Sequence, residues 1–121
     1  MASDSTGSGH HTPGRRPLTL RFPYDLHRWL HRTSVMEGRT KTALLAEAVT
    51  WIQSRSQWPE LLRSVVLPDD EAQRSSTFDL PPEVYVWLRL ESLDVGWSAN
   101  ELAMRTLVAW RTERTTASSN P

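Results

Sequence analysis

The chain has 121 residues, which is enough for one small domain with terminal tails. It contains no cysteine, which excludes disulfides and thiolate metal sites. No apolar run approaches the roughly 20 residues that a helix needs to cross a bilayer. The first residues lack the basic and then apolar order of a signal peptide, so we expect a cytoplasmic protein that does not enter a membrane.

The formal net charge is zero, but the charge is unevenly distributed. From Arg15 to Trp58 there are eight basic and three acidic residues, a net charge of +5. From Pro59 to the end there are six basic and ten acidic residues, a net charge of −4, and Asp4 supplies the remaining −1. This asymmetry indicates that the two halves do different work. The plain alternative is that both halves only carry solvated surface charge.

The sequence repeats itself at an interval of 58 residues, with no gap over about thirty residues. Leu20–Pro23 aligns with Phe78–Pro81. The further matches are Trp29 with Trp87, Leu30 with Leu88, Ser34 with Ser92, Gly38 with Gly96, and Leu44 with Leu102. Each copy has about forty residues, which is too few to bury a stable core alone. We therefore expect the copies to fold against each other or against copies from another chain.

The first copy reads as a strand followed by two helices. Apolar residues at 18, 20 and 22 alternate with Thr19 and Arg21, which predicts a short strand with one apolar face. Pro23 suits a helix start, Gly38 a helix stop, and Thr40 the N-cap of a second helix. Apolar residues follow at helical spacing in both predicted helices.

The second copy repeats this plan, with a strand at 77–80, a helix between Pro82 and Gly96, and a last helix capped by Ser98. Glu101 stands three residues after Ser98 and predicts a capping box. The expected boundaries are a disordered arm at 1–15, a first unit at 16–57, a connector at 58–74, a second unit at 75–114 and a disordered tail at 115–121. Residues 59–66 of the connector could form a turn or two of helix.

A short strand followed by two helices resembles the ribbon-helix-helix family of DNA-binding proteins, of the Arc and MetJ type. Residues 18–23 are similar to the strand of that family, and Gly38-Arg39-Thr40 resembles its turn into the second helix. The resemblance covers roughly residues 16–55 and 75–113. It implies a mainly α fold with a short two-stranded antiparallel β-ribbon, here as tandem copies that form a pseudo-dimer within one chain, with Thr19 near Thr77. Two chains that pair first copy with first copy are the alternative.

The resemblance also implies that the outward side chains of the ribbon contact bases in the major groove. These base-contacting residues are Thr19, Arg21, Ser75 and Thr77. Arg21 can donate bidentately to guanine, and the hydroxyls can bond to base edges. Asp79 departs from this pattern, because a carboxylate near phosphates is unfavourable unless it accepts from cytosine or pairs with Arg21 or Arg74. The alternative to a DNA contact is that Arg21 is a polar residue on the solvated face of the ribbon and pairs with Asp79.

The N-termini of the two second helices carry unpaired backbone N–H groups, which would anchor the flanking phosphates. The expected phosphate-contacting residues are Arg15, Arg16, Arg39, Thr40, Lys41, Thr42, Ser98 and Asn100. The second copy has Trp97 and Ala99 at the positions of Arg39 and Lys41. Its grip on phosphate should therefore be weaker than that of the first copy.

These features predict a sequence-specific double-stranded DNA-binding protein, a transcriptional repressor or regulator of bacterial, plasmid or phage type. No cofactor is expected and no enzyme is indicated, because the sequence has no nucleophile motif and no glycine-rich phosphate loop. His27 and His31 have the spacing of a metal pair, but no third ligand is evident, which favours a solvated helix face. The sequence does not decide whether copies of the protein associate with one another on DNA.

The alternative function is a protein-interaction module, antitoxin-like or adaptor, that uses the acidic second copy and exposed tryptophans. Three of the six tryptophans, Trp29, Trp87 and Trp110, lie on apolar stripes and are expected in the core. The other three, Trp51, Trp58 and Trp97, fall off the stripes or next to turns. They could cover the connector, mediate association or contact a protein partner of unknown identity.

Overall fold

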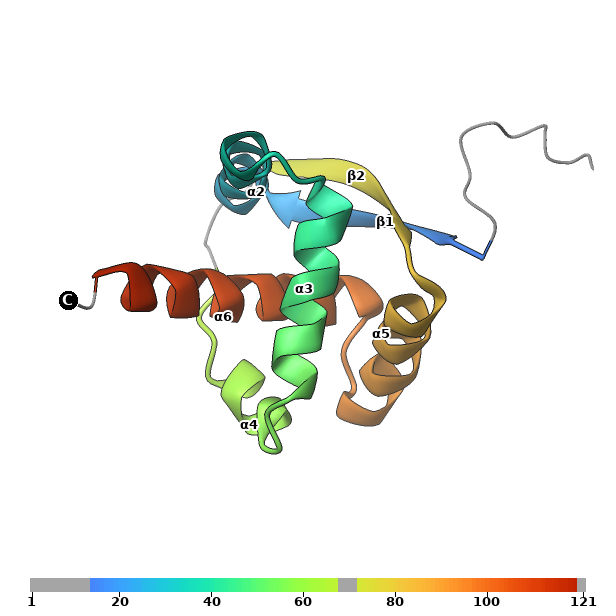
Figure 1. Ribbon diagram of the computed structural model, residues 1–121. Coiled ribbons are helices and arrows are strands. Elements are labelled where there is room, and N and C mark those ends of the chain that lie inside the picture. Colours follow the sequence, from blue (N-terminus) through green and yellow to red (C-terminus); the bar gives the residue numbers. More distant parts are fainter. Residues whose placement is uncertain (1–13, 68–71, 120–121) are drawn as a thin grey trace, which may run out of the picture.

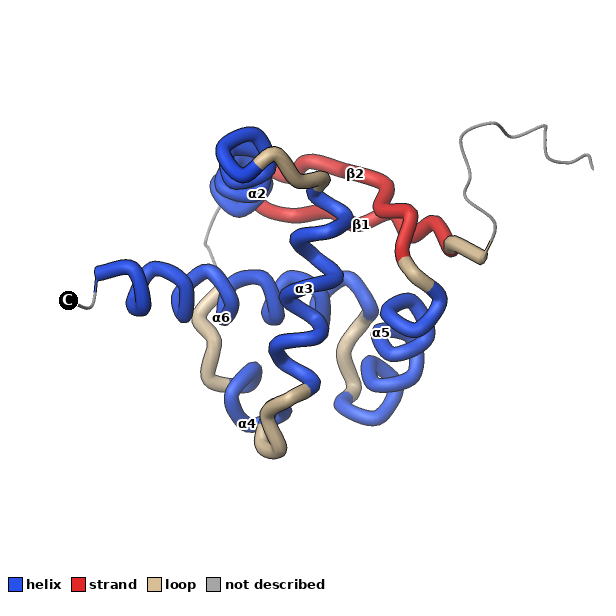
Figure 2. Tube along the Cα trace, viewed as in Figure 1, coloured by secondary structure: helices blue, strands red, loops and turns tan. Residues whose placement is uncertain are grey.

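The computed structural model describes residues 14–67 and 72–119. In chain order the elements are β1 (Arg16–Pro23), α2 (Tyr24–Glu37), α3 (Lys41–Gln53), α4 (Trp58–Arg63), β2 (Gln73–Leu80), α5 (Pro82–Val95) and α6 (Ala99–Ser119). Over the described residues the protein is mainly helical, with five helices and one two-stranded antiparallel sheet (Figures 1 and 2). The expected class, helices with a short antiparallel ribbon, is confirmed.

The ribbon pairs β1 with β2 in a register that places Thr19 opposite Thr77, as expected, and Arg21 opposite Ser75. The backbone N–H and C=O of Arg21 bond to the side chain of Asn100 and not to β2. In an antiparallel ladder, alternate residues of a strand direct their backbone groups away from the partner strand. Pro17 is four residues before Arg21, so its backbone nitrogen also points away from β2. Its missing N–H therefore removes no hydrogen bond from the ladder.

The inner face of the ribbon is apolar and sealed by the helices. Its buried side chains are Leu20, Phe22, Phe78 and Leu80. The rings of Phe22 and Phe78 lie 6.0 Å apart across the two strands. Beneath them α3 crosses α6, and the ribbon lies along one side of this pair (Figure 1). The buried stripes of both helices, including Leu44 and Leu102, complete one continuous core.

The predicted helix stops and caps are confirmed. Gly38 and Gly96 adopt left-handed conformations, with φ of 65° and 82°. The hydroxyl of Thr40 accepts from the N–H of Ala43 at 3.0 Å, and that of Ser98 accepts from Glu101 at 3.0 Å. The carboxylate of Glu101 accepts a hydrogen bond from the guanidinium of Arg105 at 2.9 Å. It therefore does not bond back to the N–H of Ser98, which would complete the expected capping box.

Helix α4 occupies the start of the connector, where a turn or two of helix was expected at 59–66, and Trp58 packs on Trp87 with ring centroids 5.1 Å apart. The C-terminal boundary differs from expectation. Helix α6 continues to Ser119, so the expectation of a disordered tail from residue 115 is wrong for residues 115–119. The extension follows from anchoring: Arg111 and Arg114 of α6 pair with carboxylates of α2, and a helix held in this way adds residues at little cost. Most of the expected arm, and residues 68–71 of the connector, lie outside the described residues.

All six tryptophans pack against the core, so the expectation that some would be exposed is wrong. Trp110 is buried, and Trp29 meets it edge-on at 6.0 Å. Trp51 and Trp97, which fall off the apolar stripes, are partly buried because arginine side chains cover their rings, each at 4.7 Å.

Within the described part of the chain, none of the helices combines the length and the apolar character needed to span a bilayer.

Candidate nucleic-acid interface

The outward side chains of the ribbon form one polar surface, which we call the ribbon face. Its members are Pro17, Thr19 and Arg21 from β1 and Ser75, Thr77 and Asp79 from β2. The four residues expected to contact bases are all exposed and lie together at its middle and at one end. The hydroxyls of Thr19 and Thr77 bond to each other across the strands at 2.9 Å. The structure therefore places the predicted base-contacting residues on one exposed surface.

The guanidinium of Arg21 makes no hydrogen bond or ion pair with any residue that the structure describes, while its backbone is held on both sides by Asn100. The register places Asp79 opposite Pro17, four residues along the ribbon from the partner of Arg21. Four residues of strand span about 13 Å, more than the two side chains can bridge. The suggested Arg21–Asp79 pair is therefore wrong, and Arg21 is a fixed residue with a freely available cationic group.

Basic residues fall into two groups according to whether they have a carboxylate partner. The ion pairs among described residues lie on the helices and the turns beside them: Arg39 with Glu37 and Glu47, Arg55 with Glu113, Arg63 with Glu60, Arg105 with Glu101, Arg111 with Asp25, and Arg114 with Glu37. No such partner is found in the described ranges for Arg15, Arg16, Arg21, Arg28, Arg32, Lys41, Arg74 or Arg89. These cations lie on the strands, directly before β1, on α2 and α5, and at the start of α3.

Two of these cations, Lys41 at the start of α3 and Arg74 on β2, act on His27 of α2. His27 of α2 bonds to the hydroxyl of Ser76 at 3.0 Å. The pKa of His27 is lowered from 6.5, first by burial and then by the positive charges of Lys41, His31 and Arg74. Lys41 and Arg74 are therefore near neighbours of the same imidazole. Arg74 is not among the residues expected to contact DNA, and its one signal in the sequence is a basic residue directly before the second predicted strand.

The N-terminus of α6 is arranged differently. Asn100 directs its side-chain amide at the backbone of Arg21, with Oδ1 to N at 2.6 Å and Nδ2 to O at 2.9 Å, so it positions the ribbon. Arg15 donates to the backbone carbonyl of Asp79 at 3.1 Å. Arg16 lies over the ring of Tyr85, 5.4 Å from its centroid. Asn100, Arg15 and Arg16 were all expected to contact phosphate. Among them, only the side chain of Arg16 makes no hydrogen bond to the described residues.

The other expected phosphate-contacting residues also differ in availability. Arg39 pairs with Glu47 and Glu37, and its hydrogen bond to Glu47 is the main cause of a raised pKa, so its charge is largely compensated. Thr40 caps α3, and Thr42 lies partly buried in its first turn. Lys41 has no carboxylate partner in the described structure and is the cation best placed beside the N–H groups of α3.

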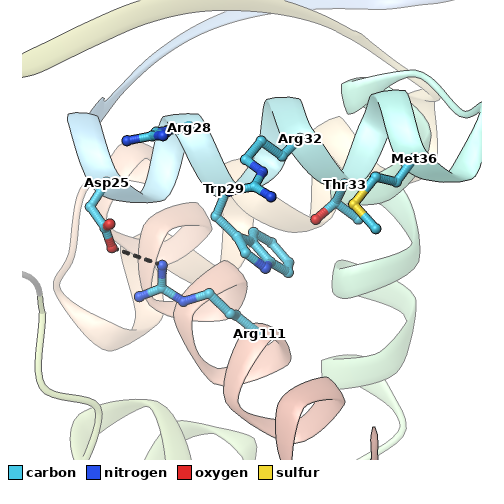
Figure 3. Close-up of a pocket in the computed structure, with 7 residues that line it drawn as sticks. All are labelled: Asp25, Arg28, Trp29, Arg32, Thr33, Met36 and Arg111. Atoms are coloured by element: carbon cyan, nitrogen blue, oxygen red, sulfur yellow. Dashed lines mark hydrogen bonds and ion pairs between the residues drawn. The ribbon is translucent and has the colours of Figure 1, made fainter.

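An open hollow of about 500 Å³ lies between α2 and α6 (Figure 3). Asp25 of α2 and Arg111 of α6 pair across it at 3.1 Å, and Trp29 projects from α2 towards α6 beside this pair. Arg28, Arg32 and Met36 line its outer side. The hollow thus combines an aromatic floor with two guanidinium groups that have no carboxylate partner among the described residues.

No cluster of three potential metal-ligating side chains occurs in the parts of the chain that the structure describes. His27 is partly buried and bonds to Ser76, so the expectation of a solvated helix face is wrong for this histidine, whereas His31 is exposed. The sequence matches no protein-family model, and searches of curated proteins and of solved structures found no match.

Proposed function

We propose that this chain is a sequence-specific double-stranded DNA-binding protein that inserts the ribbon of β1 and β2 into the major groove and acts as a transcriptional repressor or regulator. One observation carries the proposal: the ribbon face presents adjacent exposed hydroxyl and guanidinium groups, while the opposite face is sealed by the core. A two-stranded ribbon fits the major groove, where each base pair shows a distinct pattern of donors and acceptors.

We further infer a tandem ribbon-helix-helix architecture, in which one chain supplies both halves of a pseudo-dimer. In its support, α2 and α5 are both 14 residues long and start 58 residues apart, at Tyr24 and Pro82. Helices α3 and α6 also start 58 residues apart, at Lys41 and Ala99. The strands that precede these helix pairs bond to each other within the chain.

The two halves are unequal, and so the operator should be asymmetric. The first half has Arg21 and Lys41 where the second has Asp79 and Ala99. Arg21 suits a guanine, and Lys41 adds a positive charge beside the N–H groups of α3. Since the symmetry of a DNA-binding protein is mirrored in its site, unlike halves prefer unlike half-sites. The first half should supply most of the affinity.

The test begins with selection of an operator from random duplexes, followed by fluorescence-anisotropy titration of operator and random DNA at one fixed salt concentration. Replacement Arg21→Ala should reduce the preference for the operator by about 1–3 kcal/mol, a factor of roughly 5 to 150, because it removes a bidentate contact to guanine. Arg63→Ala is the matched control, because Arg63 is an exposed arginine on α4 that pairs with Glu60 at 3.5 Å. If Arg21→Ala binds operator and random duplex as the unaltered protein does, the proposed groove contact is wrong.

A further inference from the structure

An apolar stripe lies exposed along α5. Val86, Leu90 and Leu93 follow one another at helical spacing, and 44%, 57% and 77% of their surfaces are accessible. The exposed acidic residues Glu83 and Asp94 flank the stripe on one side, and the exposed Arg89 flanks it on the other. Three large apolar side chains in a row on one helix face are unusual for a surface that meets only water.

The positions 58 residues earlier, on α2, carry a different chemistry. They are Arg28, Arg32 and Val35, and the residue that corresponds to Asp94 is Met36. The counterpart of Glu83 is Asp25, which pairs with Arg111 at 3.1 Å. Val35 and Met36 are also strongly exposed, at 68% and 77%. The two arginines have no carboxylate partner in the described structure and line the open hollow above Trp29, as Figure 3 shows. The α5 face is therefore apolar with a net negative charge, and the α2 face is apolar with a net positive charge and a hollow beside it.

We propose that these two faces bind each other between copies of this chain, so that α5 of one molecule docks on α2 of the next. The leucine side chains of α5 would enter the hollow between α2 and α6, while Glu83 and Asp94 meet the guanidinium groups of Arg28 and Arg32. The methylene groups of the two arginines would pack on the leucine side chains, while their guanidinium groups pair with the carboxylates. Complementary charge favours this pairing over contact of two α5 faces, because each α5 face carries two carboxylates against the single cation Arg89 and is therefore net negative.

The topology allows such contacts to continue from copy to copy. Helix α2 follows the end of β1, and α5 follows the end of β2. Because the two strands run antiparallel, the two helices leave the ribbon at opposite ends, as Figure 1 shows. A contact between unlike faces is heterologous, so it continues from copy to copy and leaves one free face of each kind at the two ends, unless the rotation between copies closes a ring. The opposite net charges of the two halves of the sequence, +5 and −4, agree with such head-to-tail association.

The experiment uses the full chain without DNA, so its result does not depend on DNA binding. Sedimentation velocity over a concentration series should show an average mass that rises beyond that of a dimer. The double replacement Leu90→Arg with Leu93→Arg removes the α5 face, and Arg28→Glu with Arg32→Glu removes the α2 face. Each variant alone should lose at least tenfold in association, while Val66→Arg, an exposed apolar position outside both faces, should not.

The decisive sample is an equal mixture of the two double variants. One retains an intact α2 face and the other an intact α5 face, so the mixture should form dimers and nothing larger. Circular dichroism and thermal unfolding establish that both variants are folded, which is expected because all four altered side chains are exposed. The proposal is overturned if the unaltered chain stays monomeric throughout the series. Association of the α2 variant alone at the level of the unaltered chain, or a mixture that remains monomeric, would equally rule it out.

Discussion

Asn100 at the start of α6 holds the backbone of Arg21, the residue 79 positions earlier, through both groups of its side-chain amide. The two bonds use an N–H and a C=O that point away from the antiparallel ladder and have no strand partner. They fix one edge of β1 to α6 at the residue whose guanidinium is proposed to contact a base. Asn100 therefore acts as a positioning residue for the ribbon.

Replacement Asn100→Ala should lower the free energy of unfolding by about 1–2 kcal/mol, because two exposed hydrogen bonds are lost. Urea denaturation followed by tryptophan fluorescence measures the change. Thr42→Ala is the matched control, because Thr42 stands 58 residues earlier in the first turn of α3 and its side chain makes no hydrogen bond to the described residues. Equal midpoints for Asn100→Ala and the unaltered chain would show that the amide does not hold the strand.

The sequence predicted those features of the fold that depend on local signals. Alternation of apolar residues between 18 and 22 identified β1 and its buried face, and the 58-residue interval placed Thr19 opposite Thr77. Glycine at 38 and threonine at 40 marked the turn, since one tolerates a positive φ and the other caps the next helix. Each of these signals lies within a few residues of the structure that it determines.

Features that depend on distant residues were not predicted. Asn100 was expected to contact phosphate, but its amide lies against Arg21, and no spacing rule connects residues 79 apart. The length of α6 follows from arginines that pair with α2, and such partners cannot be identified before the helices are packed. The exposure of tryptophans was misjudged because arginine side chains from neighbouring turns or helices cover them. Tertiary packing decided each of these points.

Replacement Gly38→Ala should destabilise the protein by about 1 kcal/mol, the cost of placing a side chain in the left-handed region. Gly38 has a φ of 65°, and a Cβ atom there would meet no other heavy atom within 4 Å, so backbone strain alone should account for the loss. Gly38→Asn should cost less, since asparagine tolerates this conformation better. The midpoint of urea unfolding measures both. A loss from Gly38→Asn as large as that from Gly38→Ala would contradict this account.

Stability should fall as the pH is lowered from about 7 to 5, in part through His27. Burial, Lys41, His31 and Arg74 lower the pKa of His27 from 6.5 in the folded protein, so the unfolded chain binds a proton more readily. The contribution of His27 is complete above pH 6.5 and is lost as the pH falls from 6.5 through the lower folded pKa. Denaturant unfolding at several pH values measures this dependence.

His27→Gln should flatten the pH dependence of stability between pH 5 and 7, because glutamine does not titrate in this range. Its amide can also preserve a hydrogen bond to Ser76, so the variant should remain folded. His31→Gln, on the next turn of α2, serves as the matched control and should retain most of the slope, because burial is the largest cause of the shift at His27. An unchanged slope in His27→Gln would assign the acid loss to other groups.

Replacement Lys41→Ala should weaken binding to all duplexes alike, because a contact to phosphate carries no sequence information. The plot of log affinity against log salt concentration should become shallower by about 0.9, the value for one phosphate contact on B-DNA. Lys41 is suited to this role by its place in the first turn of α3 and by the lack of a carboxylate partner among described residues. Arg39→Ala provides the contrast: this guanidinium already pairs with Glu37 and Glu47, and its removal should change the salt slope less. If Lys41→Ala alters the preference for operator over random DNA and leaves the salt slope unchanged, Lys41 contacts a base and not a phosphate.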